Sequence, residues 1–286
     1  MARIADLLGS GPTFSFEFFP PKTDEEQARL AATIKDLEPL HPSFVSVTYR
    51  GGRSSRERTT AVVLDILTTT AITAMPHLVC VAHSRQELTE IVDNFNRAGV
   101  ENLLALGGDP VPDEPAGELR HALQLVELAR ARGSACVGVA AHPAGHPRSP
   151  DRSSDRHHLA AKLAVADFAI SQFFFHVEEY LRLRDELAAL GIDKPVIPGI
   201  MPVTSLKSIT RMAELSGYQL PPDVVARLSR VEHDPKEFRR VGIELAAELC
   251  RDLLAAGAPG LHFYTLNFSS ATREIYRSLE LPDTVQ

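Results

Sequence analysis

The sequence lacks several features that mark particular classes of protein. It contains no tryptophan and only three cysteines among 286 residues, at Cys80, Cys136 and Cys250. These cysteines are far apart and show no CxxC spacing, so we expect neither a disulfide framework nor a zinc knuckle. No run of about 18 apolar residues occurs, and the apolar run near the start is too short for a signal peptide. We therefore expect a cytoplasmic protein without membrane contact.

An excess of positive charge is also missing. The formal net charge is -7, from 30 Lys and Arg against 37 Asp and Glu. Nucleic-acid-binding proteins use a basic surface to attract phosphate backbones, so we expect no nucleic-acid partner, although a local basic pocket could still hold an anionic ligand. Hydrophobic residues make up 44% of the chain and charged residues 23%, which is typical of a globular protein with ample core.

Short β-rich runs alternate with longer amphipathic segments along the chain. The expected strands are Phe14 to Phe19, Phe44 to Tyr49, Met75 to Cys80, Glu101 to Leu106, Ala135 to Ala140, Phe168 to Phe174, Pro195 to Ile200 and Gly260 to Thr265. Helical apolar spacing is found in Asp24 to Leu37, Arg85 to Ala98, Glu118 to Arg132, Val177 to Leu190 and Pro235 to Leu254.

Eight such strand and helix units, with no GxGxxG after the first strand, predict a closed (β/α)8 TIM barrel rather than an open doubly wound sheet. We expect residues 1–286 to form one such domain. Gly217, Pro221, Pro222 and Pro235 interrupt the alternation and predict an extra helical insertion before the last strand. Two long loops are expected after the fourth and fifth strands, from Asp109 to Gly117 and from Ala141 to Asp151.

Polar residues stand at or near the ends of most expected strands. They are Glu17, Thr48, Tyr49, His77, Asp109, His142, Gln172, Tyr264 and Asn267. In parallel barrels the carboxyl ends of the strands carry the chemistry. Polar groups in the apolar mouth of a barrel cost free energy unless they are paired or used. This ring therefore predicts a ligand site at that end.

Two carboxylates and one amide in this ring are candidates for chemistry. Glu17 lies in the run FSFEFFPP, and because burial disfavours an ionised carboxyl group it is a candidate general acid; the alternative is a buried salt bridge. Asp109, in LALGGDP, is either a rim carboxylate that faces a ligand or an Asp-Pro turn former. Gln172, in SQFFF, either binds the amide edge of a ligand or satisfies a neighbour in the barrel.

Three histidines near these carboxylates raise the alternative of a metal-dependent hydrolase. His77, His142 and His146, with Asp109, would be its ligands. The loop AAHPAGHP is broken by prolines and a glycine, and no HxH or HExxH spacing occurs. We therefore predict no metal.

Eight segments, in order and across nearly the whole chain, resemble those of bacterial methylenetetrahydrofolate reductases. They are FSFEFFPPK, FVSVTY, PHLVC, LALGGDP, ISQFFF, YLRLRDEL, VIPGIMPV and LHFYTLN. The resemblance implies a barrel that reduces 5,10-methylenetetrahydrofolate to 5-methyltetrahydrofolate with NADH or NADPH. It implies that Glu17 is the acid that opens the substrate's imidazolidine ring and that Asp109 stabilises the resulting iminium cation. Gln172 and Tyr264 would bind the substrate.

The same resemblance implies the cofactor-binding residues, and FAD is the family's usual cofactor. They are Thr48, Tyr49, His77, Gly108, His142, His146, Asp155, His158, Lys162 and Gln172. Gly107 stands where the family usually has an arginine, and His142 where it usually has a tyrosine. His158 and Ala161 replace an asparagine and an arginine of the helix that grips the diphosphate. Each lost charge-assisted bond removes about 1.5 to 3 kcal/mol. We therefore expect weak or absent FAD binding and direct hydride transfer from nicotinamide.

Two alternatives to a reductase stay open at this point. One is the metal-dependent hydrolase on the same barrel, and the other is a non-catalytic folate-binding paralogue. The intact Glu17 and Asp109 favour a catalyst over the paralogue.

Overall fold

The computed structural model describes residues 2–49, 53–110 and 116–279, apart from the side chains of residues 53–55. Within them, parallel strands form a closed barrel in which each strand pairs with the next and β8 pairs with β1. The strands are β1 (Thr13–Phe18), β2 (Phe44–Val47), β3 (Ala74–Val79), β4 (Asn102–Leu106), β5 (Cys136–Ala141), β6 (Phe168–Phe173), β7 (Val196–Ile200) and β8 (Gly260–Tyr264). The predicted (β/α)8 barrel is confirmed.

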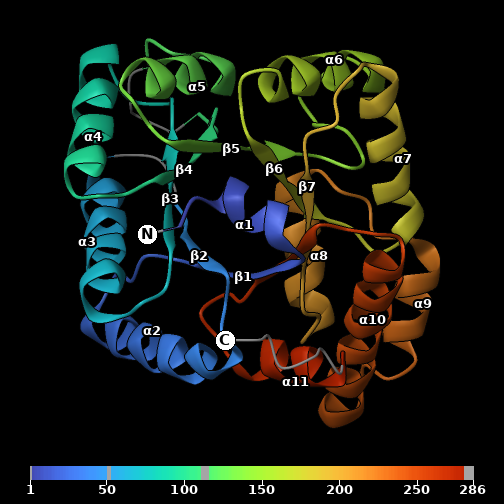
Figure 1. Ribbon diagram of the computed structural model, residues 1–286. Helices are drawn as coiled ribbons and strands as arrows, with labels where there is room; N and C mark the ends of the chain where they lie inside the picture. Colours follow the sequence, from blue (N-terminus) through green and yellow to red (C-terminus); the bar gives the residue numbers. More distant parts are fainter. Residues whose placement is uncertain (1, 50–52, 111–115, 280–286) are drawn as a thin grey trace.

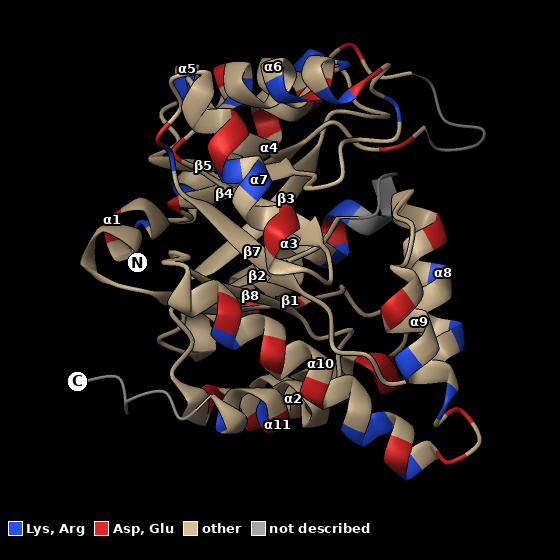
Figure 2. Cartoon of the chain, turned by 90° about the vertical axis from the view of Figure 1, so that its right-hand side faces the viewer, with Lys and Arg blue, Asp and Glu red and all other residues tan. Residues whose placement is uncertain are grey.

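Helices surround this barrel (Figure 1). They are α2 (Asp24–Leu37), α3 (Arg53–Thr69), α4 (Arg85–Arg97), α5 (Ala122–Ala131), α6 (Arg152–Leu163), α7 (Val177–Ala189), α8 (Leu206–Ser216), α9 (Pro222–Ser229), α10 (Pro235–Ala255) and α11 (Ser270–Ser278). The helix α9 occupies the insertion predicted before the last strand. Most charged residues lie on the helices, whereas the strands carry few (Figure 2). None of the helices over the described residues has the length and apolar character needed to cross a bilayer.

Local signals explain where individual helices begin. Ser84 and Glu87 form a capping box at the start of α4, and Asp234 accepts hydrogen bonds from the first backbone amides of α10. Both devices satisfy amide groups that have no partner within the helix. Pro235 then fits the first position of α10, where its missing N–H costs nothing.

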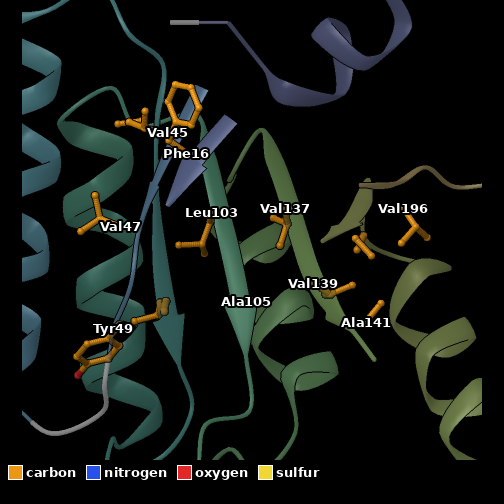
Figure 3. Packing of buried hydrophobic residues seen from close by; sticks show 14 of the residues in the cluster. Phe16, Val45, Val47, Tyr49, Leu103, Ala105, Val137, Val139, Ala141 and Val196 are labelled. Atoms are coloured by element: carbon orange, nitrogen blue, oxygen red, sulfur yellow. The ribbon is translucent and has the colours of Figure 1, made fainter. Parts of the chain in front are cut away.

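Successive side chains point to opposite faces of each strand, so the apolar core has a part outside the barrel and a part inside it. One face of each strand packs against the surrounding helices, as Phe16, Val45, Val137 and Val139 do (Figure 3). The other face fills the barrel, where apolar side chains gather at the N-terminal end of the strands. They are Phe44, Met75, Leu104, Cys136, Phe168, Ile170 and Ile197. This end is therefore packed shut, and polar side chains stand further along the strands.

The short helix α1 (Ile4–Ser10) was not expected from the sequence. Its Ile4 is fully buried in the apolar cluster at the N-terminal end of the barrel. Asn102 at the start of β4 fixes it, because its Oδ1 accepts a hydrogen bond from Ile4 N (2.8 Å) and its Nδ2 donates one to Ala2 O (2.9 Å). The helix therefore covers the end of the barrel opposite to the expected ligand site.

Candidate active site

Glu17 lies near the C-terminal end of β1 and points into the barrel. Its backbone pairs with Ser46 of β2 and Tyr264 of β8, and its side chain is 12% exposed. Because side chains alternate along a strand, Phe16 and Phe18 point outward into the helix layer. The carboxylate therefore lies inside the barrel, away from the phenylalanine rings on either side of it in the sequence.

Two histidines flank the Glu17 carboxylate. The Nε2 atoms of His77 and His262 each lie 3.5 Å from Glu17 Oε2. Burial lowers the pKa of His77 to about 4, although the nearby Glu17 acts in the opposite direction. His77 is therefore neutral near pH 7, and its contact with Glu17 is not a salt bridge. His262 is fully buried, and its Nδ1 lies 2.8 Å from Ser15 Oγ.

Thr48 follows Ser46 by two residues, and Ser46 Oγ lies 3.4 Å from His262 Nε2, so strand alternation turns Thr48 to the same inner face. We call Glu17, Thr48, His77 and His262 the inner cluster. Thr48 Oγ1 and His77 Nε2 are buried and make no hydrogen bond within the described part of the chain. Buried polar atoms without a partner are rare, and they often mark a place where a ligand or water binds. Tyr49 differs, because its hydroxyl is hydrogen-bonded to the His83 ring, on which its own ring stacks at 5.8 Å.

The predicted substrate ligands on β6 and β8 make hydrogen bonds within the chain. Tyr264 donates its hydroxyl to Ser171 O (2.7 Å), and burial together with Glu17 raises its pKa well above the ordinary value. Its ring packs on Gly199, where a Cβ atom would lie 2.6 Å away. Gln172 lies at an irregularity in the β6–β7 pairing, and its Oε1 accepts a hydrogen bond from Phe173 N (3.0 Å).

Asp109 is placed very differently from Glu17. It follows β4 on the rim of the barrel, and 90% of its side chain is exposed. Its Oδ1 lies 3.5 Å from Arg148 Nη2, and the same nitrogen donates to Gly108 O (3.0 Å). Gly108 has a φ of +79°, and a Cβ there would lie 2.6 Å from Val81, so only glycine fits this turn.

Two histidines of the loop after β5 lie beside this turn. The rings of His142 and His146 pack edge to face with centroids 4.6 Å apart. Burial, the His146 ring and the Lys162 ammonium lower the pKa of His142 to about 3, so His142 is neutral near pH 7. Burial and Arg148 lower the pKa of His146 in the same direction. We call Asp109, His142, His146, Arg148 and Lys162 the rim cluster.

The helix α6 brings two of its predicted residues to this cluster and leaves one outside. Asp155 accepts hydrogen bonds from His146 N (3.1 Å) and Ser149 Oγ (3.4 Å). Lys162 donates Nζ to Ala140 O (2.7 Å), and its burial lowers the pKa of the amine to about 8. His158 is exposed on the solvent side of the helix. Over the described residues, no group of three or more His, Cys, Asp or Glu is arranged to hold a metal ion.

Sequence comparison assigns the family. The model of the methylenetetrahydrofolate reductase family matches residues 3–280. The chain belongs to this family. The 5,10-methylenetetrahydrofolate reductase of Pectobacterium carotovorum is 36% identical over 285 residues, which cover 99% of this chain and 95% of that one. The Escherichia coli enzyme of the same name is 35% identical over 266 residues, with 93% and 90% covered.

One solved structure shares the fold over nearly its whole length. It is a protein from Clostridium thermocellum described as binding two copies of 5-methyl-5,6,7,8-tetrahydrofolic acid. The TM-score is 0.66 at 12% sequence identity, and 96% of this chain and 97% of that one are covered. At such low identity the likeness concerns the barrel architecture alone.

Most of the residues to which the resemblance gave a role lie at the C-terminal end of the barrel. The sequence analysis missed two residues that make close contacts there, His262 and Arg148. His262 contacts Glu17 from a strand 245 residues away in the sequence. The signal for it was its place two residues before Tyr264 in β8, which puts both side chains on the same face. Arg148 was missed because it lies on an irregular loop, where periodicity carries no information.

Proposed function

We propose that the protein reduces 5,10-methylenetetrahydrofolate to 5-methyltetrahydrofolate, with hydride taken directly from NADH or NADPH. The observation that carries this proposal is the carboxyl group of Glu17, held inside the barrel mouth between two histidines, in a chain of this family. The reaction consumes one hydride and one proton, so it needs a residue that supplies a proton beside the carbon that accepts the hydride.

Glu17 supplies that proton in the proposed mechanism. Opening of the imidazolidine ring turns N10 into an amine, and Oε2 of protonated Glu17 donates the proton that N10 needs to leave. The carbon bridge stays on N5 as an iminium cation, to which the hydride adds. Glu17 suits this role because its side chain lies inside the barrel mouth and is only 12% exposed.

Asp109 stabilises the iminium cation in this proposal. Its carboxylate is exposed and 3.5 Å from Arg148, and in this proposal it turns toward the bound pterin. A carboxylate near a developing positive charge lowers the barrier to its formation. Gln172 contributes through Nε2, which makes no hydrogen bond to the described residues and is free to donate to the ring. Tyr264 shapes the wall beside Gly199.

The rim cluster fits a tightly bound FAD poorly. Arg156 donates to carbonyls and a carboxylate of the chain itself, and the buried Lys162 donates to Ala140 O. Gly107 offers no side chain, and His158 faces solvent. A flavin that stays bound through turnover needs several charge-assisted bonds, whereas a nicotinamide dinucleotide that comes and goes needs fewer. This supports a single hydride transfer in a ternary complex.

A spectrum and an anaerobic assay of the purified full-length protein test the proposal. We expect no flavin absorption at about 450 nm. We also expect NADH oxidation that depends on methylenetetrahydrofolate and does not increase with added FAD. Flavin bound in a 1:1 ratio would refute direct transfer. Absence of any folate-dependent oxidation, with or without FAD, would refute the reductase. Metal bound to the purified protein, together with no folate-dependent NADH oxidation, would instead favour the hydrolase.

A further inference from the structure

Arg148 connects the two long loops on the rim of the barrel. It lies on the loop between β5 and α6, and it reaches the turn after β4, where its Nη2 donates to Gly108 O (3.0 Å) and lies 3.5 Å from Asp109 Oδ1. About half of its side chain, 53%, is exposed. Its cationic group therefore stands at the mouth of the barrel and in contact with solvent.

Two cations of α6, Arg156 and Lys162, help to hold the loop between β5 and α6 together. Arg156 is 3% exposed and donates to Glu186 Oε2 (2.6 Å), His142 O (3.0 Å) and Pro143 O (2.7 Å). Lys162 donates to Ala140 O. A guanidinium group has five N–H donors, and Arg148 gives one of its nitrogens to a carbonyl and an exposed carboxylate. Arg148 thus keeps donors that no described residue uses.

Gly107 and Gly108 precede Asp109 in the turn that Arg148 reaches. A Cβ atom at Gly107 would lie at ordinary contact distance, 3.9 Å from Ala122 N and 4.0 Å from Arg120 O. The rings of His142 and His146 border the turn on the side of β5, and the pKa values of both are lowered, so they add no charge near pH 7. An anion that binds at Arg148 is therefore attracted by the guanidinium group and not by these two rings.

We propose that Arg148 binds the diphosphate of the dinucleotide that supplies the hydride. The inference rests on the proposed function, because it takes the ligand to be the dinucleotide of that reaction. A planar guanidinium can bind two phosphate oxygens at once, which a single ammonium group cannot match. Asp109 competes with the diphosphate for Arg148, so dinucleotide binding releases the Asp109 carboxylate toward the substrate.

Equilibrium titration of the full-length chain, without folate, tests the role of Arg148. Arg148→Gln is expected to weaken NADH binding about tenfold, and Arg148→Lys to restore part of the affinity. Raising the salt concentration weakens binding more in the wild type than in Arg148→Gln, since an exposed charge is screened. Asp109→Asn is expected to bind NADH at least as tightly as the wild type, because a competitor has been removed.

Arg184→Gln is the matched control. Arg184 also donates to a backbone carbonyl (Ala256 O, 3.0 Å), lies near an exposed carboxylate (Asp185, 3.8 Å) and is 48% exposed. It contacts the C-terminal end of α10, which precedes β8 and so lies at the opposite end of the barrel. We expect its NADH affinity to equal that of the wild type.

The outcomes separate this inference from the proposed function. If Arg148→Gln binds NADH and FAD as the wild type does, Arg148 is not a diphosphate ligand, even if flavin-free reduction is observed. If the wild type instead holds FAD and Arg148→Gln loses it, the diphosphate role stands with flavin as the source, and direct transfer from NADH fails. If both Arg148→Gln and Arg184→Gln weaken NADH binding equally, the effect is a general one of charge and the inference fails.

Discussion

The inner cluster and the rim cluster hold their carboxylates in opposite ways. Glu17 is enclosed by strands β1, β2 and β8 and contacts two buried histidines, whereas Asp109 stands on a loop with most of its side chain in solvent. The Glu17 side chain is 12% exposed, and the Asp109 side chain is 90% exposed. In the proposed mechanism the enclosed Glu17 is the group for proton transfer, and the exposed Asp109 is the group for charge stabilisation.

The largest loss of kcat is expected when Glu17 is changed. Glu17→Gln keeps the shape of the side chain but removes the transferable proton, so kcat should fall by about a hundredfold to ten-thousandfold. Anaerobic NADH oxidation measures kcat, and folate titration of the same variant should give a dissociation constant close to that of the wild type. A variant that keeps a tenth or more of the activity would show that Glu17 is not the acid.

Gly199 packs against the Tyr264 ring beside the inner cluster and has no room for a Cβ atom. In Gly199→Ala the new Cβ would lie 2.3 Å from Ser171 O and 2.6 Å from the Tyr264 ring, and we expect a loss of about 1 to 3 kcal/mol in the free energy of unfolding. Urea denaturation measures it. Gly107→Ala on the rim is the control, because its Cβ has room, and an equal loss there would contradict the difference in packing between the two clusters.

His77 makes the inner cluster sensitive to acid. Folded His77 has a pKa of about 4 against an ordinary value of 6.5, so the unfolded chain binds more protons between these values. Stability should therefore fall as the pH drops from 6.5 toward 4, by about 2 kcal/mol at pH 5 from this residue. His77→Asn cannot titrate and should lose less stability between pH 7 and pH 5. Urea denaturation at both pH values checks this, and exposed His158→Asn should behave as the wild type.

A smaller loss of kcat is expected when Asp109 on the rim is changed. Asp109→Asn removes a negative charge that is exposed and partly screened, so kcat should fall only about tenfold. Steady-state assays measure it. Asp185→Asn is the control, because Asp185 is also exposed and near an arginine but lies on α7, away from the strand ends. A loss as large as that of Glu17→Gln would mean that Asp109 enters the enclosed part of the site during turnover.

The architecture was predictable from the sequence because it depends on local patterns. The expected helix Asp24 to Leu37 coincides with α2, and the expected strand Pro195 to Ile200 differs from β7 by one residue. The helix expected from Glu118 begins later, at Ala122, because Glu118 N donates instead to His83 O. The helix α1 was missed because it has only seven residues and is held mainly by distant contacts.

The site was predictable only in part. The positions of Glu17 and Asp109 at strand ends follow from the barrel, but their surroundings depend on contacts between distant segments. The histidines beside Glu17 come from β3 and β8, and Arg148 reaches Gly108 across 40 residues. No periodicity encodes such contacts, so the exposure of Asp109 and the partners of Glu17 required the structure.

The cover formed by α1 restricts how molecules move through the barrel. With Ile4 and the apolar cluster sealing the N-terminal end, both reactants must enter, and both products must leave, by the same opening. If the hydride passes directly from nicotinamide to the folate, as proposed, both molecules have to occupy that opening at the same time. The order in which they arrive and depart therefore decides whether one blocks the exit of the other, and an excess of either product should slow turnover by occupying the shared entrance.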